Sequence, residues 1–177
     1  MSGPRQRVLG ALAAALACLV AVQSRAGEPT AVPDVIAQQA GLRLRPMSPA
    51  ARFYAMNCQG CHGNLGVSVA EIPPLAGRMG YFVRIPEGRR YLIELPNIAM
   101  NPGSNEEIAA VLNWALYTYS RAQLPASFEP YTAAEVGQWR KQRIDVSARR
   151  RQVIERLLAL GQIPSGQVLA LSASAGY

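Results

Sequence analysis

Two cysteines separated by two residues stand directly before a histidine in this chain, as Cys58, Cys61 and His62. Thiols at this spacing can add to the two vinyl groups of a porphyrin, and the histidine that follows then lies beneath the iron as its fifth ligand. The motif therefore predicts one covalently attached haem c, bound through Cys58 and Cys61 and ligated by His62.

Paired cysteines also occur in structural zinc sites and in redox-active dithiols. A structural zinc ion needs four ligands, typically from two such pairs, but this chain has one histidine and only one further cysteine, Cys18. A thioredoxin-like dithiol belongs to a βαβ context, which the sequence does not show. Both alternatives are therefore weaker than haem attachment.

Residues 1–26 have the pattern of a secretory signal peptide. Two arginines precede an unbroken apolar run over 8–22, and Ser24-Arg25-Ala26 supplies small residues for cleavage. The run is shorter than the roughly 20 residues of a membrane helix. We therefore expect cleavage after residue 26, a periplasmic protein and no membrane span afterwards. A retained anchor, or a lipoprotein attached through Cys18, is the alternative.

The composition agrees with a small exported domain. Three arginines lie within residues 1–26, so their removal lowers the formal net charge from +7 to +4. Much of the basic character therefore belongs to the signal peptide, and nucleic acid is not an expected partner. The remaining length predicts one domain with an appendage.

The segments around the motif predict how it is presented. Residues 27–47 lack periodicity and are expected to form an extended N-terminal arm. Ser48 and Pro49 predict the start of a helix over 50–57 that leads into Cys58. Residues 63–80 are rich in glycine and broken by two prolines, which indicates a loop around the haem.

Two further helices are expected in the domain. Residues 86–95 are interpreted as a short helix. Ser104 and Glu107 form a capping box before an apolar repeat at helical spacing over 105–120. Trp114 of this helix is expected to pack against Tyr54 of the first.

Residues 123–177 are predicted to form a helical C-terminal extension. Thr132 and Glu135 make a second capping box, and Asp145 can cap a further helix with one apolar stripe. The tail from Ser165 lacks charge and is expected to be mobile. The whole chain is therefore interpreted as all-α.

Arginines are frequent among these helices. The consecutive residues 149–151 fan around a helix by about 100° each, so one of them must approach its apolar stripe. Arg78 and Arg89 are the candidates for pairing with a haem propionate, because arginine makes bidentate contacts to carboxylates. The remaining basic residues are interpreted as a solvated face or as a docking surface for an acidic partner.

With these features in place, residues 48–122 resemble a class I (mitochondrial-type) monohaem cytochrome c domain. The resemblance lies in the order of helix, C-x-x-C-H motif, wrapping loop, methionine and C-terminal helix, and in Pro73-Pro74-Leu75-Ala76-Gly77, which is similar to the P-x-L-x-G turn of that family. It implies a small cytochrome c fold wrapped around one haem. It also implies that the Pro73 carbonyl accepts a hydrogen bond from the imidazole of His62.

A second resemblance concerns the partner. Gly80-Tyr81-Phe82, Glu87-Gly88-Arg89 and Asn113-Trp114 are similar to segments of small cytochromes that partner periplasmic quinoprotein dehydrogenases. This implies a periplasmic redox partner, a dehydrogenase or an oxidase.

The sixth ligand of the iron must come from another residue type, because His62 is the only histidine. Met56 lies too close to Cys58 to cross the ring. Met100 precedes the last core helix, where the resembling family carries its distal methionine, so we take Met100 as the second metal ligand and Met79 as the alternative.

An iron with ligands on both faces has no open site for a substrate. The expected function is therefore one-electron transfer, without enzymatic activity. Two alternatives stay open: a five-coordinate haem c protein that acts as a ligand sensor or peroxidase, and a dedicated cytochrome subunit of an oxidoreductase complex. The C-terminal extension motivates the second alternative.

Overall fold

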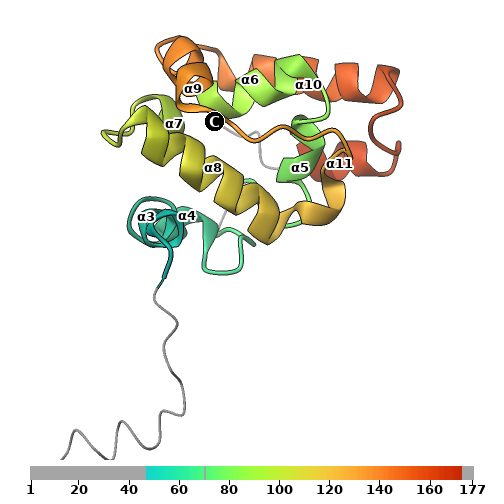
Figure 1. Cartoon of the computed structure of the whole chain (residues 1–177). Coiled ribbons are helices and arrows are strands. Elements are labelled where there is room, and N and C mark those ends of the chain that lie inside the picture. Colours follow the sequence, from blue (N-terminus) through green and yellow to red (C-terminus); the bar gives the residue numbers. More distant parts are fainter. Residues whose placement is uncertain (1–46, 70, 173–177) are drawn as a thin grey trace, which may run out of the picture. The chain divides into compact units, whose positions relative to one another are not determined.

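The computed structural model describes residues 47–69 and 71–172 of the chain (Figure 1). These two segments contain helices and no strand, which confirms the predicted all-α class. The predicted signal peptide and nearly all of the N-terminal arm lie outside the described residues. None of the described helices is long and apolar enough to cross a membrane.

The first two helices present the motif. The side chain of Ser48 accepts a hydrogen bond of 3.1 Å from the backbone N–H of Ala51, so α3 (Pro49–Asn57) begins as predicted. The helix stops at Cys58, which in turn caps the single turn α4 (Gln59–His62). The tyrosine of α3, Tyr54, donates a hydrogen bond of 2.7 Å to the carbonyl of Gly63, which ties α3 to the residue after His62.

Three short helices follow the glycine-rich loop. They are α5 (Met79–Phe82), α6 (Pro86–Glu94) and α7 (Pro96–Ala99). Prolines occupy the first positions of α6 and α7, where the missing N–H needs no partner. The short helix predicted over 86–95 is thus confirmed.

Helix α8 (Asn105–Tyr119) carries the largest share of the core. Both hydrogen bonds of the predicted capping box are present, between Ser104 and Glu107. Figure 1 shows α8 between α3 and α9 (Ala133–Trp139), and it packs against both. The ring of Trp114 lies 4.9 Å from that of Tyr54, which confirms their predicted contact.

The C-terminal part contains the 3-10 turn η2 (Arg121–Gln123), α9, α10 (Val146–Ala159) and α11 (Gln167–Ser172). Asp145 caps α10 as predicted. The predicted capping box of α9 forms only in part: Thr132 accepts from the N–H of Glu135, but the Glu135 carboxylate pairs with Arg89 at 2.7 Å. The ion pair therefore replaces the second bond of the box.

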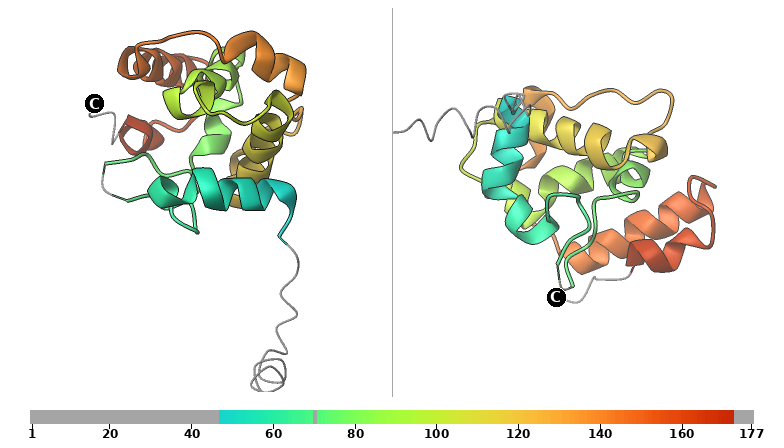
Figure 2. Two further views of the ribbon diagram at one scale, coloured as in Figure 1. Left: turned by 90° about the vertical axis from the view of Figure 1, so that its left-hand side faces the viewer. Right: turned by 90° about the horizontal axis from the view of Figure 1, so that it is seen from below.

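The expectation of a mobile tail from Ser165 is wrong for residues 167–172. These residues form α11, and both views of Figure 2 show α11 beside α10. The uncharged tail carries Val168 and Leu171 one turn apart, and Leu171 is fully buried. This apolar face packs on α10 and offsets the entropy cost of ordering the segment.

One apolar core joins the cytochrome-like segment and the extension. Buried residues of α6 and α8, such as Tyr91 and Leu112, belong to the same cluster as Val153 and Leu157 of α10. The extension from residue 123 therefore forms part of the fold that surrounds the site.

Candidate haem site

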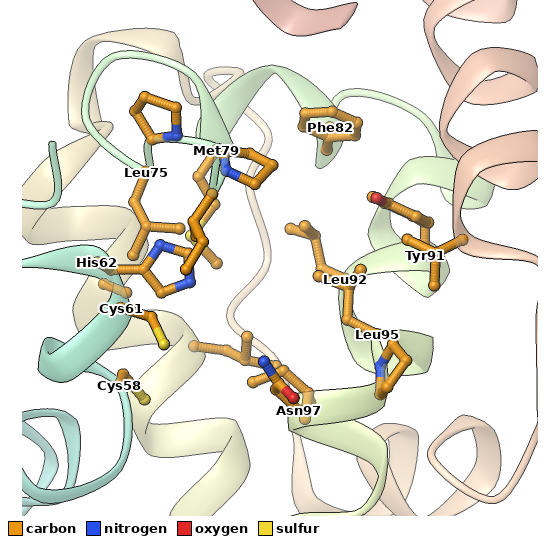
Figure 3. A pocket seen from close by; sticks show the side chains of 18 of the residues that line it. Cys58, Cys61, His62, Leu75, Met79, Phe82, Tyr91, Leu92, Leu95 and Asn97 are labelled. Atoms are coloured by element: carbon orange, nitrogen blue, oxygen red, sulfur yellow. The ribbon is translucent and has the colours of Figure 1, made fainter. Parts of the chain in front are cut away.

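A cavity of about 580 Å³ lies among α3, α4, the loop before α5, α6, α7, α8 and the start of α10. Its volume falls within the range of about 300–1,000 Å³ that is common for ligand and cofactor sites. Cys58, Cys61, His62 and Pro73 all line it. The structure thus brings together four residues that the sequence had assigned to haem binding (Figure 3).

The two thiols lie on one edge of the cavity. Cys58 and Cys61 are three residues apart across the turn of α4, which places them on the same side of a helix, and Figure 3 shows their sulfurs near each other. They do not form a disulfide. Burial raises the pKa of the Cys58 thiol to about 11, and the neighbouring Cys61 acts in the same direction. Since neither thiol is in a disulfide, both sulfurs are available for thioether bonds.

The imidazole of His62 is fixed through its Nδ1 atom. This atom lies 3.1 Å from Ser68 Oγ, and the Ser68 hydroxyl donates a hydrogen bond of 2.9 Å to the carbonyl of Pro73. Since the single proton of the hydroxyl goes to Pro73, Ser68 Oγ accepts from Nδ1–H. This arrangement selects the tautomer in which Nε2 carries the free lone pair.

The protonation state of His62 also suits a metal ligand. Burial lowers the pKa of the imidazole, and the nearby Pro73 carbonyl, which polarises the Ser68 hydroxyl, opposes part of this shift. A neutral imidazole whose Nδ1–H is engaged can bind iron through Nε2.

The other walls of the cavity are mostly apolar. Across from His62, Figure 3 shows Leu92 and Leu95 of α6–α7, with Asn97 beside them. Met79 is also in the cavity, with 6% of its surface exposed, and Figure 3 shows it on the same side as Leu75 and His62. Such walls fit the faces of a porphyrin.

The structure does not bring Met100 to this cavity. Its side chain is 72% exposed and lines a smaller hollow of about 200 Å³ with Arg143 and Glu94. Met100 ends α7, and its N–H bonds to the carbonyl of Pro96. It follows directly after the wall that faces His62, but its side chain points away from the cavity. Met79, the alternative, is inside.

The expected propionate partners are elsewhere. Neither Arg78 nor Arg89 lines the cavity. Arg78 donates to the carbonyl of Ala170 at 2.7 Å, and Arg89 is engaged by Glu135 and by the Glu129 carbonyl. The expectation that Arg78 or Arg89 pairs with a propionate is therefore not supported, because both side chains make hydrogen bonds to residues of the C-terminal extension.

Two residues of the site escaped the sequence analysis. Ser68 gave no signal, because its role depends on a left-handed backbone conformation with φ of +65°, which a serine rarely adopts. Arg150 belongs to the triplet 149–151, one member of which had to approach the apolar stripe. It is the buried member, and it lines the cavity.

These features together define a c-type cytochrome site. Two thiols, a neutral imidazole with an ordered Nδ1–H and a large cavity with apolar walls match what a covalent haem requires.

Comparison with known proteins agrees. A cytochrome c-552 of Thermus thermophilus is 32% identical over 123 residues, covering 59% of this chain and 82% of its own length. A second cytochrome c-552 of the same species is 32% identical over 113 residues, covering 53% and 86%. No protein-family model matches the chain.

The chain therefore belongs to the monohaem c-type cytochromes of class I. It is a haem c electron carrier, and Cys58 and Cys61 supply the C-x-x-C-H site for one covalently bound haem.

Proposed function

We propose that this cytochrome is a periplasmic one-electron carrier that accepts electrons from a dehydrogenase, with its haem bound to Cys58, Cys61 and His62. The observation that carries the proposal is the chain of hydrogen bonds from His62 through Ser68 to the Pro73 carbonyl. It holds the imidazole in one tautomer and one orientation, which an axial ligand requires.

The bound haem supplies a one-electron Fe(III)/Fe(II) couple, and the protein supplies binding, orientation and surroundings. Leu92, Leu95 and the other apolar residues that line the cavity would exclude water from a bound ring. Surroundings of low polarity favour the ferrous state, which carries less net charge. Because Ser68 and Pro73 hold His62, its imidazole would keep one orientation as the ligand of a bound haem.

For the sixth coordination position we keep Met100 as the proposed ligand and Met79 as the alternative. Met100 stands at the end of α7, two residues after Ile98, which lines the cavity, and ligation requires that its exposed side chain turn inward. Met79 is already in the cavity, but it lies on the side of Leu75 and His62.

The exposure of Met100 favours a second candidate function. If its side chain stays outside, the wall opposite His62 offers leucines and Asn97, which are not common ligands of haem iron. The iron then keeps an open position, as in a ligand sensor or a peroxidase.

The optical spectrum of the oxidised holoprotein tests both functions. A methionine-to-iron charge-transfer band that disappears in Met100→Ala supports the carrier with Met100, and one that disappears only in Met79→Ala supports the alternative ligand. Met56→Ala is the control, since Met56 is 79% exposed and does not line the cavity. A high-spin wild type that binds cyanide or carbon monoxide rapidly favours the second function.

For partner docking we propose the loop after His62. Leu65, Val67 and Val69 are 66%, 59% and 50% exposed and lie within seven residues of the axial histidine. Exposed apolar groups beside a site are typical of interaction surfaces. A partner resting on this loop would lie close to Cys61 and His62, because the loop is tied to them: the N–H of Ser68 bonds to the His62 carbonyl and that of Val69 to the Cys61 carbonyl.

The proposed dehydrogenase carries acidic residues. Exposed cations in and before α10 support this choice: Lys141, Arg143, Arg151 and Arg156. Opposite charges accelerate association at low ionic strength, and salt screens them. We expect the cytochrome to co-purify with an oxidoreductase at low salt and to detach at high salt; association that is indifferent to salt would contradict the acidic partner.

A further inference from the structure

Arg150 of α10 is a buried cation in the wall of the haem cavity. Arg150 is only 7% exposed, although most arginines keep their charged group in water. The guanidinium has five N–H donors in a fixed fork. Nε donates to the Leu171 carbonyl at 2.9 Å, and Nη1 donates to the Tyr91 hydroxyl at 3.3 Å. Nη2 makes no hydrogen bond within the described residues.

No carboxylate pairs with Arg150 in the described part of the chain. The ion pairs there join Arg89 to Glu135 and Arg90 to Glu94. Both acceptors of Arg150 are neutral, and its third neighbour is the face of the Phe82 ring, 5.2 Å away. Buried charges in proteins are normally paired with an opposite charge. The position of Arg150 in the cavity wall therefore points to an anion that comes with the bound group.

The position of Arg150 along the cavity identifies that anion. Thioether bonds form at the vinyl side of a porphyrin, and its two propionates extend from the opposite side. Figure 3 shows Cys58 and Cys61 at one side of the cavity, and Phe82 and Tyr91 across from them. The guanidinium of Arg150 contacts both of these aromatic residues. It thus lies at the end where the propionates arrive.

We propose that Arg150 binds a propionate of the haem through Nη1 and Nη2, so that the C-terminal extension supplies part of the haem site. The inference rests on the proposed binding of haem through Cys58 and Cys61. The Tyr91 hydroxyl and the Leu171 carbonyl hold the guanidinium in place, so that its fork faces the cavity. The carboxylate neutralises the buried cation, and the cation keeps the propionate ionised.

The test uses three variants of the holoprotein. Arg150→Met removes the charge at similar length, Arg150→Lys keeps the charge without the fork, and Arg151→Met is the matched control on the next, exposed residue of α10. The readouts are the propionate bending band in the resonance Raman spectrum and the midpoint potential of the haem.

We expect Arg150→Met to shift the propionate band and to move the Fe(III)/Fe(II) equilibrium toward the ferric state by about tenfold, which is about 59 mV for one electron. The direction follows because removal of a nearby cation stabilises the more positive iron. Arg150→Lys should give a smaller change in both readouts, and Arg151→Met should match the wild type.

An unchanged propionate band in both Arg150 variants, or equal changes in Arg151→Met, would overturn the assignment. Arg150→Lys keeps the test valid if Arg150→Met does not yield folded protein. The wild type separates this inference from the proposed function: without covalent haem or a reversible couple in the wild type, the function itself fails. With both present, only the variants decide on Arg150.

Discussion

The Ser68 hydroxyl donates a hydrogen bond of 2.9 Å to the Pro73 carbonyl, and its oxygen lies 3.1 Å from Nδ1 of His62. Ser68 thereby stands between Pro73 and His62, where the resemblance to class I cytochromes implies a direct bond. The hydroxyl oxygen accepts a hydrogen bond from Nδ1–H, and the hydroxyl proton is donated to the Pro73 carbonyl, so the two hydrogen bonds polarise each other. A serine in a left-handed conformation thus takes part in orienting the proposed iron ligand.

Removing this hydroxyl should raise the reduction potential. The hydrogen bond to Nδ1–H makes the imidazole a stronger donor to iron and so stabilises the ferric state. Ser68→Gly removes this hydrogen bond, which is worth about 1 kcal/mol. We expect the midpoint potential of the variant to be more positive than that of the wild type. Glycine accepts a positive φ without strain, which keeps the backbone in place.

Ser68→Asn is the matched control, because asparagine tolerates a positive φ and its side-chain oxygen can still accept from Nδ1–H, so the potential should stay near that of the wild type. Potentials of Ser68→Gly and wild type that coincide would contradict the role of Ser68.

Leu171 should be essential for stability, although it belongs to a tail without charge. Its side chain is fully buried, so Leu171→Ala should lower the free energy of unfolding by about 2–5 kcal/mol. Leu169 of the same helix is 81% exposed, and Leu169→Ala should change that free energy by less than about 0.5 kcal/mol. Denaturant unfolding followed by circular dichroism compares the two; equal effects would mean that α11 does not pack as described.

Arg140 should hold the turn after Met100. Its guanidinium donates to the carbonyls of Ala99 and Gly103 and to the side chain of Asn105. Arg140→Ala should therefore cost about 2 kcal/mol of unfolding free energy, since hydrogen bonds from charged donors are among the stronger ones. The exposed neighbour Lys141 serves as control, and a loss in Lys141→Ala as large as in Arg140→Ala would argue against this role.

A close backbone approach should make Gly88 irreplaceable. A Cβ at this position of α6 would lie 2.2 Å from the Phe82 carbonyl oxygen, which is backbone and cannot move aside cheaply. Gly88→Ala should lower the melting temperature of the holoprotein strongly. Gly166, in the turn before α11, has open space around its added Cβ, so Gly166→Ala should melt near the wild type. A melting temperature of Gly88→Ala that equals that of the control would contradict the packing of α5 against α6.

A negative charge placed in the proposed docking loop should slow electron transfer from the partner dehydrogenase. Val67→Glu places an anion among exposed apolar residues without touching the cavity. We expect a lower bimolecular rate of reduction by the partner dehydrogenase and an unchanged midpoint potential. Val67→Lys is the charge-reversed control, and an equal slowing by both signs would point to apolar contact alone.

Local signals in the sequence predicted much of this fold. Ser48, Ser104 and Asp145 each cap the helix expected of them, because a cap depends on residues within one turn. Thr132 and Glu135 show the limit of such reasoning. Glu135 satisfied the local pattern, yet its carboxylate pairs with Arg89, which is 46 residues away in sequence.

The residues of the site show the same difference between local and long-range signals. Cys58, Cys61 and His62 share a local motif, and they line one cavity as expected. Met100 was assigned from its place before α8, but the direction of its side chain depends on how α7 ends, which no local pattern encodes. Arg150 and Ser68 depend on tertiary packing and on an unusual backbone angle, so their roles emerge only in the folded chain.

The most direct test of the account is a redox titration of the purified native protein, together with extraction of a parallel sample with acidified acetone. We predict that the pigment stays with the polypeptide through Cys58 and Cys61 and titrates as one reversible one-electron couple. A pigment that passes into the solvent, or a bound haem without a reversible couple, would contradict the account.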